Sequence, residues 1–202
     1  LVLAELDISV AAVPVEAGIV GIAVGFGAQN LVKDYFTGMF LLIENQLATG
    51  DVVTIAGLSG TVEDMTLRHV RLRDASGHVH YIYNGLITTV TNRTQGFAYA
   101  VMDIPVGYGE DVDHVIRVLA EVGSEMKAEP QYAARILEPL DISGVYSLGN
   151  NAVVIRCRFK TRAPEQWSVR REFLKRVKAA FDARGIEIPF PQLTLHVASP
   201  GA

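Results

Sequence analysis

GIVGIAVGFGAQNLVKDYFTG, residues 18–38, is rich in glycine for so apolar a stretch of chain. In a helix interior each Gly costs roughly 1 kcal/mol relative to Ala, so a buried soluble helix gains nothing from these residues. No charged residue lies between Glu16 and Lys33. As a helix, residues 15–32 extend ~27 Å, close to the ~30 Å hydrocarbon core of a bilayer. The stretch therefore predicts a membrane-crossing helix whose glycines serve close packing.

Small and large residues of this helix fall on different faces. Ile22 and Phe26 lie one turn apart on a bulky face, together with Ile19. Small-xxx-small stripes let membrane helices approach closely, because lipid supplies no hydrophobic drive for their association. One interpretation is a ring of identical helices around an apolar pore that gates by dewetting; the alternative is that the bulky residues face lipid or another helix. The small stripe consists of Ala17, Gly21, Gly25 and Ala28.

The character of the chain changes after Gln29 and Asn30. Residues 31–46, LVKDYFTGMFLLIENQ, place a few polar side chains opposite a broad apolar face. Such an amphipathic helix lies along an interface more readily than it spans a membrane. Gln29 and Asn30 are the predicted bend, since side-chain amides can satisfy freed backbone groups and Asn tolerates unusual backbone angles. Gly38 is a second predicted hinge.

These residues carry a resemblance to a known family. Residues 21–53, GIAVGFGAQNLVKDYFTGMFLLIENQLATGDVV, and residues 57–85, GLSGTVEDMTLRHVRLRDASGHVHYIYNG, resemble the small-conductance mechanosensitive channel (MscS-like) family. The rest of the chain is similar in layout and ends in the family's PFPQ segment, residues 189–192. The resemblance implies a seven-fold ring of identical subunits, whose last transmembrane helix lines the pore above a cytoplasmic vestibule.

The resemblance also implies roles for single residues. Ile22 and Phe26 take the positions of two apolar constriction rings, Phe26 in place of the usual Leu. The small stripe takes the helix-packing positions, and Asn30 takes a kink position at which better-known members carry Gly. The chain starts without Met inside apolar sequence, so we expect it to be the C-terminal part of a multi-pass protein of the cell membrane. Its C-terminal domains are then cytoplasmic.

Three segments are expected: a pore helix with its amphipathic continuation at 1–47, an Sm-like β-barrel domain at 48–98, and a ferredoxin-like α+β domain at 99–202. From Asp51 the hydrophobic period is two, and glycines mark the corners of short strands, as in a small barrel. Some Sm-like domains bind RNA. The net charge of −4 and the balanced charge of residues 48–98 exclude the basic surface that nucleic-acid binding requires.

Three histidines of this segment raise the question of a metal site. His78 and His80 share one strand face, and His69 is a possible neighbour. A metal site needs a third ligand and hydrogen bonds that orient the ligands. The favoured interpretation is therefore that these histidines lie at the surface and bind no metal. Tyr83 stands where many relatives carry Pro before Asn84, and we expect a differently shaped turn there.

The last segment predicts the order βαββαβ, a ferredoxin-like layout. Helices are expected at 111–126 and 166–184, and strands at 100–108, 135–140, 152–161 and 193–197. Cys157, the single cysteine, shares a strand face with apolar residues and is interpreted as a core thiol. The second helix is rich in Arg and Lys, which indicates a solvated face or, alternatively, a surface that biases ion access to the vestibule.

No enzyme site emerges from the sequence. GFGAQN lacks the third glycine, the preceding strand and the later acidic residue of a dinucleotide-binding loop, and no catalytic residues or cofactor are predicted. The favoured function is the pore-forming subunit of a channel opened by membrane tension, which releases ions and small solutes on hypo-osmotic shock. The alternatives are a membrane-anchored oligomeric scaffold and a solute exporter that tension does not gate. Expected partners are identical subunits, the lipid bilayer and permeating ions and osmolytes, with no nucleic acid.

Overall fold

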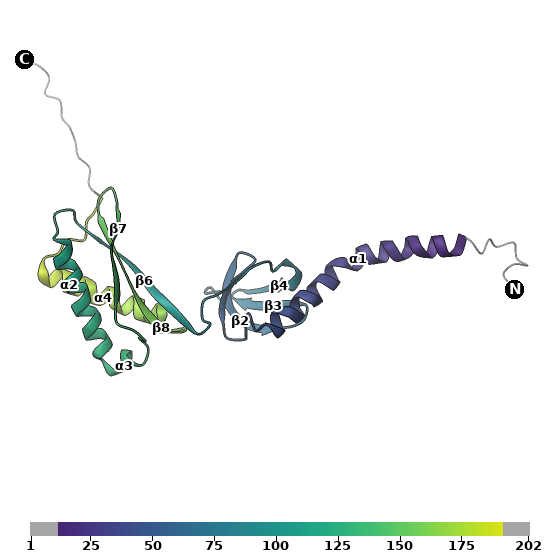
Figure 1. The fold of residues 1–202 in the computed structure, drawn as a ribbon, viewed down its shortest axis with the longest axis horizontal. Helices are drawn as coiled ribbons and strands as arrows, with labels where there is room; N and C mark the ends of the chain where they lie inside the picture. Colours follow the sequence, from purple (N-terminus) through teal and green to yellow (C-terminus); the bar gives the residue numbers. More distant parts are fainter. Residues whose placement is uncertain (1–11, 192–202) are drawn as a thin grey trace, which may run out of the picture. The chain divides into compact units, whose positions relative to one another are not determined.

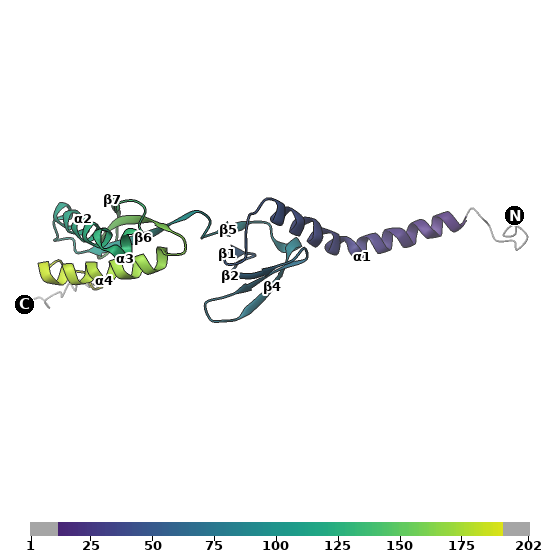
Figure 2. The same ribbon diagram turned by 90° about the horizontal axis from the view of Figure 1, so that it is seen from below.

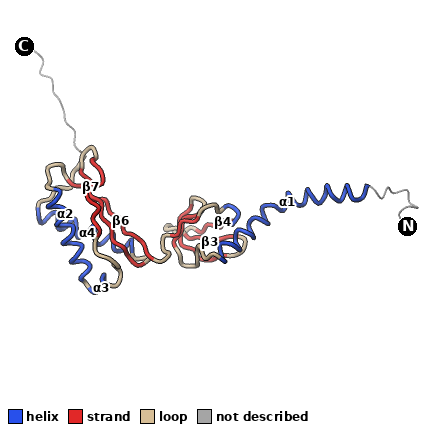
Figure 3. Tube along the Cα trace, in the orientation of Figure 1, coloured by secondary structure: helices blue, strands red, loops and turns tan. Residues whose placement is uncertain are grey.

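The computed structural model describes residues 12–191 of the 202. The chain divides into two compact units, Leu1–Arg93 and Thr94–Ala202. Figure 1 shows helix α1 and a small sheet in the first unit, and a second sheet with its own helices in the second unit. Figure 3 separates the helices from the strands of both units by colour. The three-part division at residues 47 and 98 stays a prediction.

Helix α1 runs without interruption over Ala12–Ile43. It stays helical through Gln29 and Asn30, and Figure 1 shows that it changes direction along its length. Its exact hinge residues stay a prediction. Among residues 12–191, no helix reaches the combined length and hydropathy of a membrane span, and the crossing by residues 15–32 likewise stays a prediction.

The first unit contains a five-stranded antiparallel sheet in the order β4-β3-β2-β1-β5. The sheet is open in the described part of the chain, with β4 and β5 as its edges, where we expected a small barrel. Strand β5 is only three residues long, so it offers little backbone to close the sheet. The strands are β1 (Val52–Ile55), β2 (Leu58–Met65), β3 (His69–Arg73), β4 (Val79–Tyr83) and β5 (Val90–Asn92), with a 3-10 turn η1 (Asn84–Leu86) after β4.

The core of the first unit joins the end of α1 to the sheet. Leu41 of α1 and Leu47 after it are buried with alternate residues of the strands. The alternation buries Val53 and Ile55 and leaves Val52 and Thr54 half-buried on the other face, because successive side chains of a strand point to opposite faces. The remaining core residues are Val62, Val70, Leu72, Ile82 and Ile87.

The second unit is built on a three-stranded antiparallel sheet in the order β6-β8-β7. Figure 2 shows helices α2 and α4 of this unit from a second direction. Strands β6 and β7 are parallel to each other with β8 between them, which is the split βαβ arrangement of a ferredoxin-like layout. The elements are β6 (Phe97–Val106), α2 (Val112–Ala128), α3 (Pro130–Ala133), β7 (Asp141–Leu148), β8 (Val153–Arg162) and α4 (Gln166–Arg184).

One predicted strand was placed wrongly. Residues 135–140 contain only a single bridge, Ile136 to Thr161, and the strand follows at β7. Two register shifts in β7, between Ile142 and Gly144 and between Val145 and Ser147, break the alternation by which a strand is detected. The predicted strand at 193–197 lies outside the described residues.

The two long helices of the second unit, α2 and α4, pack on one face of its sheet. Phe159 of β8 meets Phe173 of α4 edge to face, with ring centroids 5.2 Å apart. Val115 and Leu119 of α2 join the same core. Cys157 is fully buried there, and this burial raises the pKa of its thiol to about 12, so the expectation of a core thiol is confirmed.

An ion pair between α4 and Glu129, the residue between α2 and α3, is expected to make the second unit sensitive to acid. Two guanidinium nitrogens of Arg176 donate to the Glu129 carboxylate, at 2.5 and 2.8 Å. These bonds, with one from Gln131, lower the pKa of Glu129 from 4.5 to about 2. A carboxylate whose pKa is lower in the folded than in the unfolded state stabilises the fold at pH values above its unfolded pKa. That stabilisation is lost as the pH falls through the folded pKa. We expect Glu129→Gln to flatten the pH dependence of unfolding between about pH 5 and 2, measured by urea denaturation. An unchanged pH dependence of unfolding in Glu129→Gln would contradict the stabilising role of this ion pair. Glu125→Gln is the control variant.

Candidate functional site

The joint between α1 and the β-sheet of the first unit is closely fitted at Gly38. A β-carbon added there would lie 2.1 Å from the carbonyl oxygen of Leu67 and 2.2 Å from Nδ2 of Asn84. No real side chain tolerates such distances, and the first of these atoms belongs to the backbone. Gly38 is therefore the residue that lets α1 lie against the loop before β3 and the turn η1. Its predicted role as a hinge stays a prediction.

Two hydrogen-bonding side chains complete this joint. Oδ1 of Asp34 on α1 accepts a hydrogen bond of 2.8 Å from the backbone N–H of Gly85 in η1. Asn84, fully buried, donates from Nδ2 to the carbonyl oxygen of Thr66 at 3.0 Å. The side of this helix that faces the protein carries Asp34, Gly38 and Leu41, whereas Phe36, Phe40 and Ile43 point outward and are 57%, 52% and 71% exposed. A soluble helix buries its large apolar side chains.

Asp34→Ala is expected to weaken the joint. It leaves the buried N–H of Gly85 without an acceptor, which costs about 1–3 kcal/mol. We expect faster hydrogen exchange of the Gly85 amide and a lower midpoint of unfolding of the first unit. Asp34→Asn, which keeps an acceptor oxygen, is the matched variant and should recover part of the loss. Equal exchange rates of the Gly85 amide in wild type and Asp34→Ala would contradict a stabilising contact between Asp34 and Gly85.

The N-terminal half of α1 has no partner within the chain among the described residues. Ile22 and Phe26 are 62% and 74% exposed. A β-carbon added at Gly21 or Gly25 meets no atom within 4 Å, so packing inside one chain does not require glycine at either position. Ala28 is half-buried, and Gln29 and Asn30 are exposed. The side chain of Ala17 lies outside the described residues.

A small pocket lies where α1 leaves the sheet. It has a volume of about 210 Å³ and is lined by Asn30, Lys33 and Asp34 of α1 and by Tyr83, Gly85 and Leu86. Arg68 places its guanidinium 5.1 Å from the centre of the Tyr83 ring. The backbone of Tyr83, at φ −65° and ψ 134°, is one that Pro also adopts, and the expectation of a differently shaped turn stays a prediction.

The three histidines do not converge. His78 Nδ1 and His80 Nε2 lie 3.1 and 3.0 Å from the same oxygen, Oδ2 of Asp74, and these contacts, His80 first, lower the pKa of Asp74. His69 instead contacts Thr66 and the ring of Tyr81. Within residues 12–191 no group of three or more His, Cys, Asp or Glu side chains is placed to hold a metal ion.

The charges of the second unit are largely paired with one another. On the outer face of its sheet Arg156 pairs with Asp103, Arg158 with Asp141, and Lys160 with Glu138. Each of these cations also lies against an aromatic ring, of Tyr146, Tyr99 and Phe97 respectively. On α4, Lys175, Arg176, Lys178 and Arg184 are likewise ion-paired. This pairing favours a solvated helix whose cations are largely ion-paired over the alternative of a surface that biases ions.

Family models match both units. The model described as "Mechanosensitive ion channel, beta-domain" matches residues 30–95, which include the joint of α1 with the sheet. The model described as "Mechanosensitive ion channel MscS, C-terminal" matches residues 100–188. The fold and the joint therefore define a protein of the mechanosensitive ion-channel class, which is not a class of enzymes.

Individual relatives agree with these models. The chain is 40% identical to a small-conductance mechanosensitive channel of Caldanaerobacter subterraneus, over 89% of this chain and 62% of that protein. It is 35% identical to the moderate conductance mechanosensitive channel YbiO of Escherichia coli, over 100% of this chain and 27% of that protein. The crystal structure of Helicobacter pylori MscS in its closed state superposes with a TM-score of 0.82 at 25% identity, covering 98% of this chain and 78% of that one. The chain belongs to the MscS-like family, and it spans less than two thirds of the first two relatives.

Proposed function

We propose that this chain is part of the pore-forming subunit of a membrane channel that bilayer tension opens. Identical copies form a ring, seven by the resemblance, and release ions and small solutes on hypo-osmotic shock. In the closed state Ile22 and Phe26 form two apolar rings that exclude water. The Gly21 and Gly25 faces, with Ala17 and Ala28, pack neighbour against neighbour. The β-sheet of the first unit and the whole second unit stand on the cytoplasmic side of the cell membrane.

The observation that carries this proposal is the exposed apolar surface of α1. The C-terminal half of the helix docks on the β-sheet through Asp34, Gly38 and Leu41, whereas large apolar side chains between Val20 and Ile43 are exposed. Exposed apolar surface on this scale marks contact with a membrane or with another protein chain. A membrane-embedded ring satisfies both, because lipid and neighbouring helices cover the same surface. The open glycine positions support close helix contacts between chains.

The joint at Gly38 and Asp34 supplies mechanical coupling in this proposal. Tension favours a state in which the pore helices tilt and the ring widens. The C-terminal half of α1 is held on the β-sheet, so the tilt is concentrated between the docked half and the exposed half. Gln29 and Asn30 lie at this boundary and serve as the hinge.

The test is patch-clamp recording of the full-length protein in liposomes, with suction applied to the patch. We expect large stepwise currents that appear only under tension. Silent patches, with oligomeric protein demonstrated in the same membranes, would favour the scaffold. Currents that appear without suction would favour the exporter that tension does not gate.

A further inference from the structure

The chain that follows α1 is tied to the β-sheet by a second set of hydrogen bonds, away from the joint. Past Ile43 it turns at Asn45, whose φ of 50° is left-handed, a common way to end a helix. Leu47 then enters the core and is 2% exposed. Asp51, directly before β1, receives the chain, because its Oδ2 accepts a hydrogen bond of 2.9 Å from the backbone N–H of Ala48.

Asn92, the last residue of β5, completes these contacts. Its Nδ2 donates to the same Oδ2 of Asp51 at 2.7 Å and to the backbone carbonyl oxygen of Gln46 at 3.2 Å. A hydrogen bond to a carboxylate is roughly twice as strong as one between neutral groups. We call Gln46, Asp51 and Asn92 the end anchor of α1. The end anchor joins the residues after the helix to the start of β1 and the end of β5, which are paired strands.

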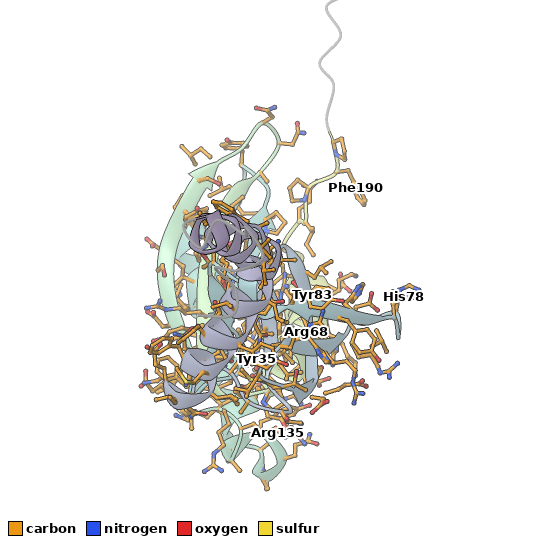
Figure 4. The ribbon with its side chains drawn as sticks, turned by 90° about the vertical axis from the view of Figure 1, so that its right-hand side faces the viewer. Tyr35, Arg68, His78, Tyr83, Arg135 and Phe190 are labelled. Atoms are coloured by element: carbon orange, nitrogen blue, oxygen red, sulfur yellow. The ribbon has the colours of Figure 1, made fainter. Side chains whose placement is uncertain are left out.

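The C-terminal half of α1 is thus attached to the sheet at two separate places. The joint holds it at η1 through Asp34 and Gly38, and the end anchor holds the chain past Ile43. From position 34 to position 43 a helix rises about 14 Å. Figure 4 views the molecule from the N-terminal side of α1 and labels Tyr35 on the docked half and Tyr83 directly before η1. A helix attached at two places this far apart cannot pivot about either of them.

We propose that Asp51 and Asn92 set the tension at which the channel opens. They are positioning residues, which act on the pore through α1, and the inference rests on the proposed function. While the end anchor holds, the docked half of α1 cannot follow the tilt of the exposed half, so opening has to bend the helix between the two halves. Without the end anchor the docked half pivots at η1 and follows the tilt. Less bending is then required, and less tension opens the pore.

The first part of the test establishes the contact in the full-length protein. Asp51→Ala removes the acceptor of both the Ala48 amide and the Asn92 side chain. We expect the Ala48 amide to exchange its hydrogen about fivefold faster, since the net contribution of a typical hydrogen bond corresponds to about that factor in an equilibrium constant. Asp51→Asn keeps an acceptor oxygen and should exchange at nearly the wild-type rate. Equal exchange in wild type and Asp51→Ala would refute the end anchor.

The second part measures gating in liposome patches. Asn92→Asp replaces the donating amide by a carboxylate that faces the carboxylate of Asp51, so the contact becomes repulsive. We expect the suction at half-maximal current to fall while the single-channel conductance stays at its wild-type value. Asp51→Asn/Asn92→Asp restores a donor and an acceptor in exchanged positions and should bring the suction back toward wild type. Asn150→Asp, the same change between β7 and β8 of the second unit, is the control and should leave the suction unchanged.

Other results would overturn the inference. An unchanged suction in a conducting Asn92→Asp variant would make the end anchor a structural contact without a part in gating, while the channel function stands. A higher suction would show that the contact transmits tension to the pore and does not resist opening. If the exchanged pair conducts but fails to restore the suction, the effect belongs to charge and not to this contact. Silent wild-type patches instead refute the channel, and this inference with it.

Discussion

Gly38→Ala is expected to detach the C-terminal half of α1 from the β-sheet. The new methyl group would lie 2.1 Å from the Leu67 carbonyl oxygen and 2.2 Å from Nδ2 of Asn84. The amide of Asn84 is itself held by its bond to Thr66. Neither neighbour can move without breaking the turn or the sheet, so the helix must shift. Overpacking of this kind costs about 1–3 kcal/mol, even though Ala is the better helix former.

The measurement is hydrogen exchange of the protein in lipid nanodiscs. Gly38→Ala should expose the Gly85 amide, because the bond from that amide to Asp34 depends on the same contact. Gly27→Ala is the matched control: it lies on the same helix, and an added β-carbon there meets no atom within 4 Å. It should gain about 1 kcal/mol of helix stability. Identical exchange at Gly85 in the two variants would show that the close approach at Gly38 is not maintained in the membrane.

The general plan of the chain could be predicted from local patterns. Alternation of apolar residues predicted the strands that carry the core residues Val53 and Ile55, and helical spacing predicted α2 and α4. A resemblance carried by contiguous motifs gave the family. These signals are local, because each depends on residues within one strand, one helix or one turn.

The joint could not be predicted, because its contacts join distant parts of the chain. Asp34 and Gly85 are separated by 51 positions, and the tight approach of Gly38 depends on where Leu67 and Asn84 fall after the sheet has formed. A weak signal was present in Asp34, an acid on a helix whose other residues are mostly apolar. The stacking of Arg68 on Tyr83 depends on the pairing of β3 with β4 and was equally hidden.

Ile22→Ser and Phe26→Ser are expected to produce a channel that leaks without tension. Both side chains are exposed on the same face of α1, four residues apart. In the proposed ring each substitution replaces a circle of apolar side chains by a circle of hydroxyl groups. An apolar constriction stays closed because water leaves it, and hydroxyls that hydrogen-bond water remove this barrier. The loss of apolar area is larger at Phe26, so Phe26→Ser should leak more.

The readouts are the resting current of liposome patches without suction and the growth of cells that express each variant. We expect Phe26→Ser to pass current at rest and to slow growth, whereas wild type is silent until suction is applied. Val20→Ser and Val24→Ser are the matched controls: both residues are exposed on the same half of α1, but at 100° per residue they lie about 160° away from Ile22 and Phe26 respectively. A leak of equal size in the controls would indicate general helix disruption. Silent patches and normal growth for Ile22→Ser and Phe26→Ser, with tension-gated currents intact, would move the constriction to another part of α1.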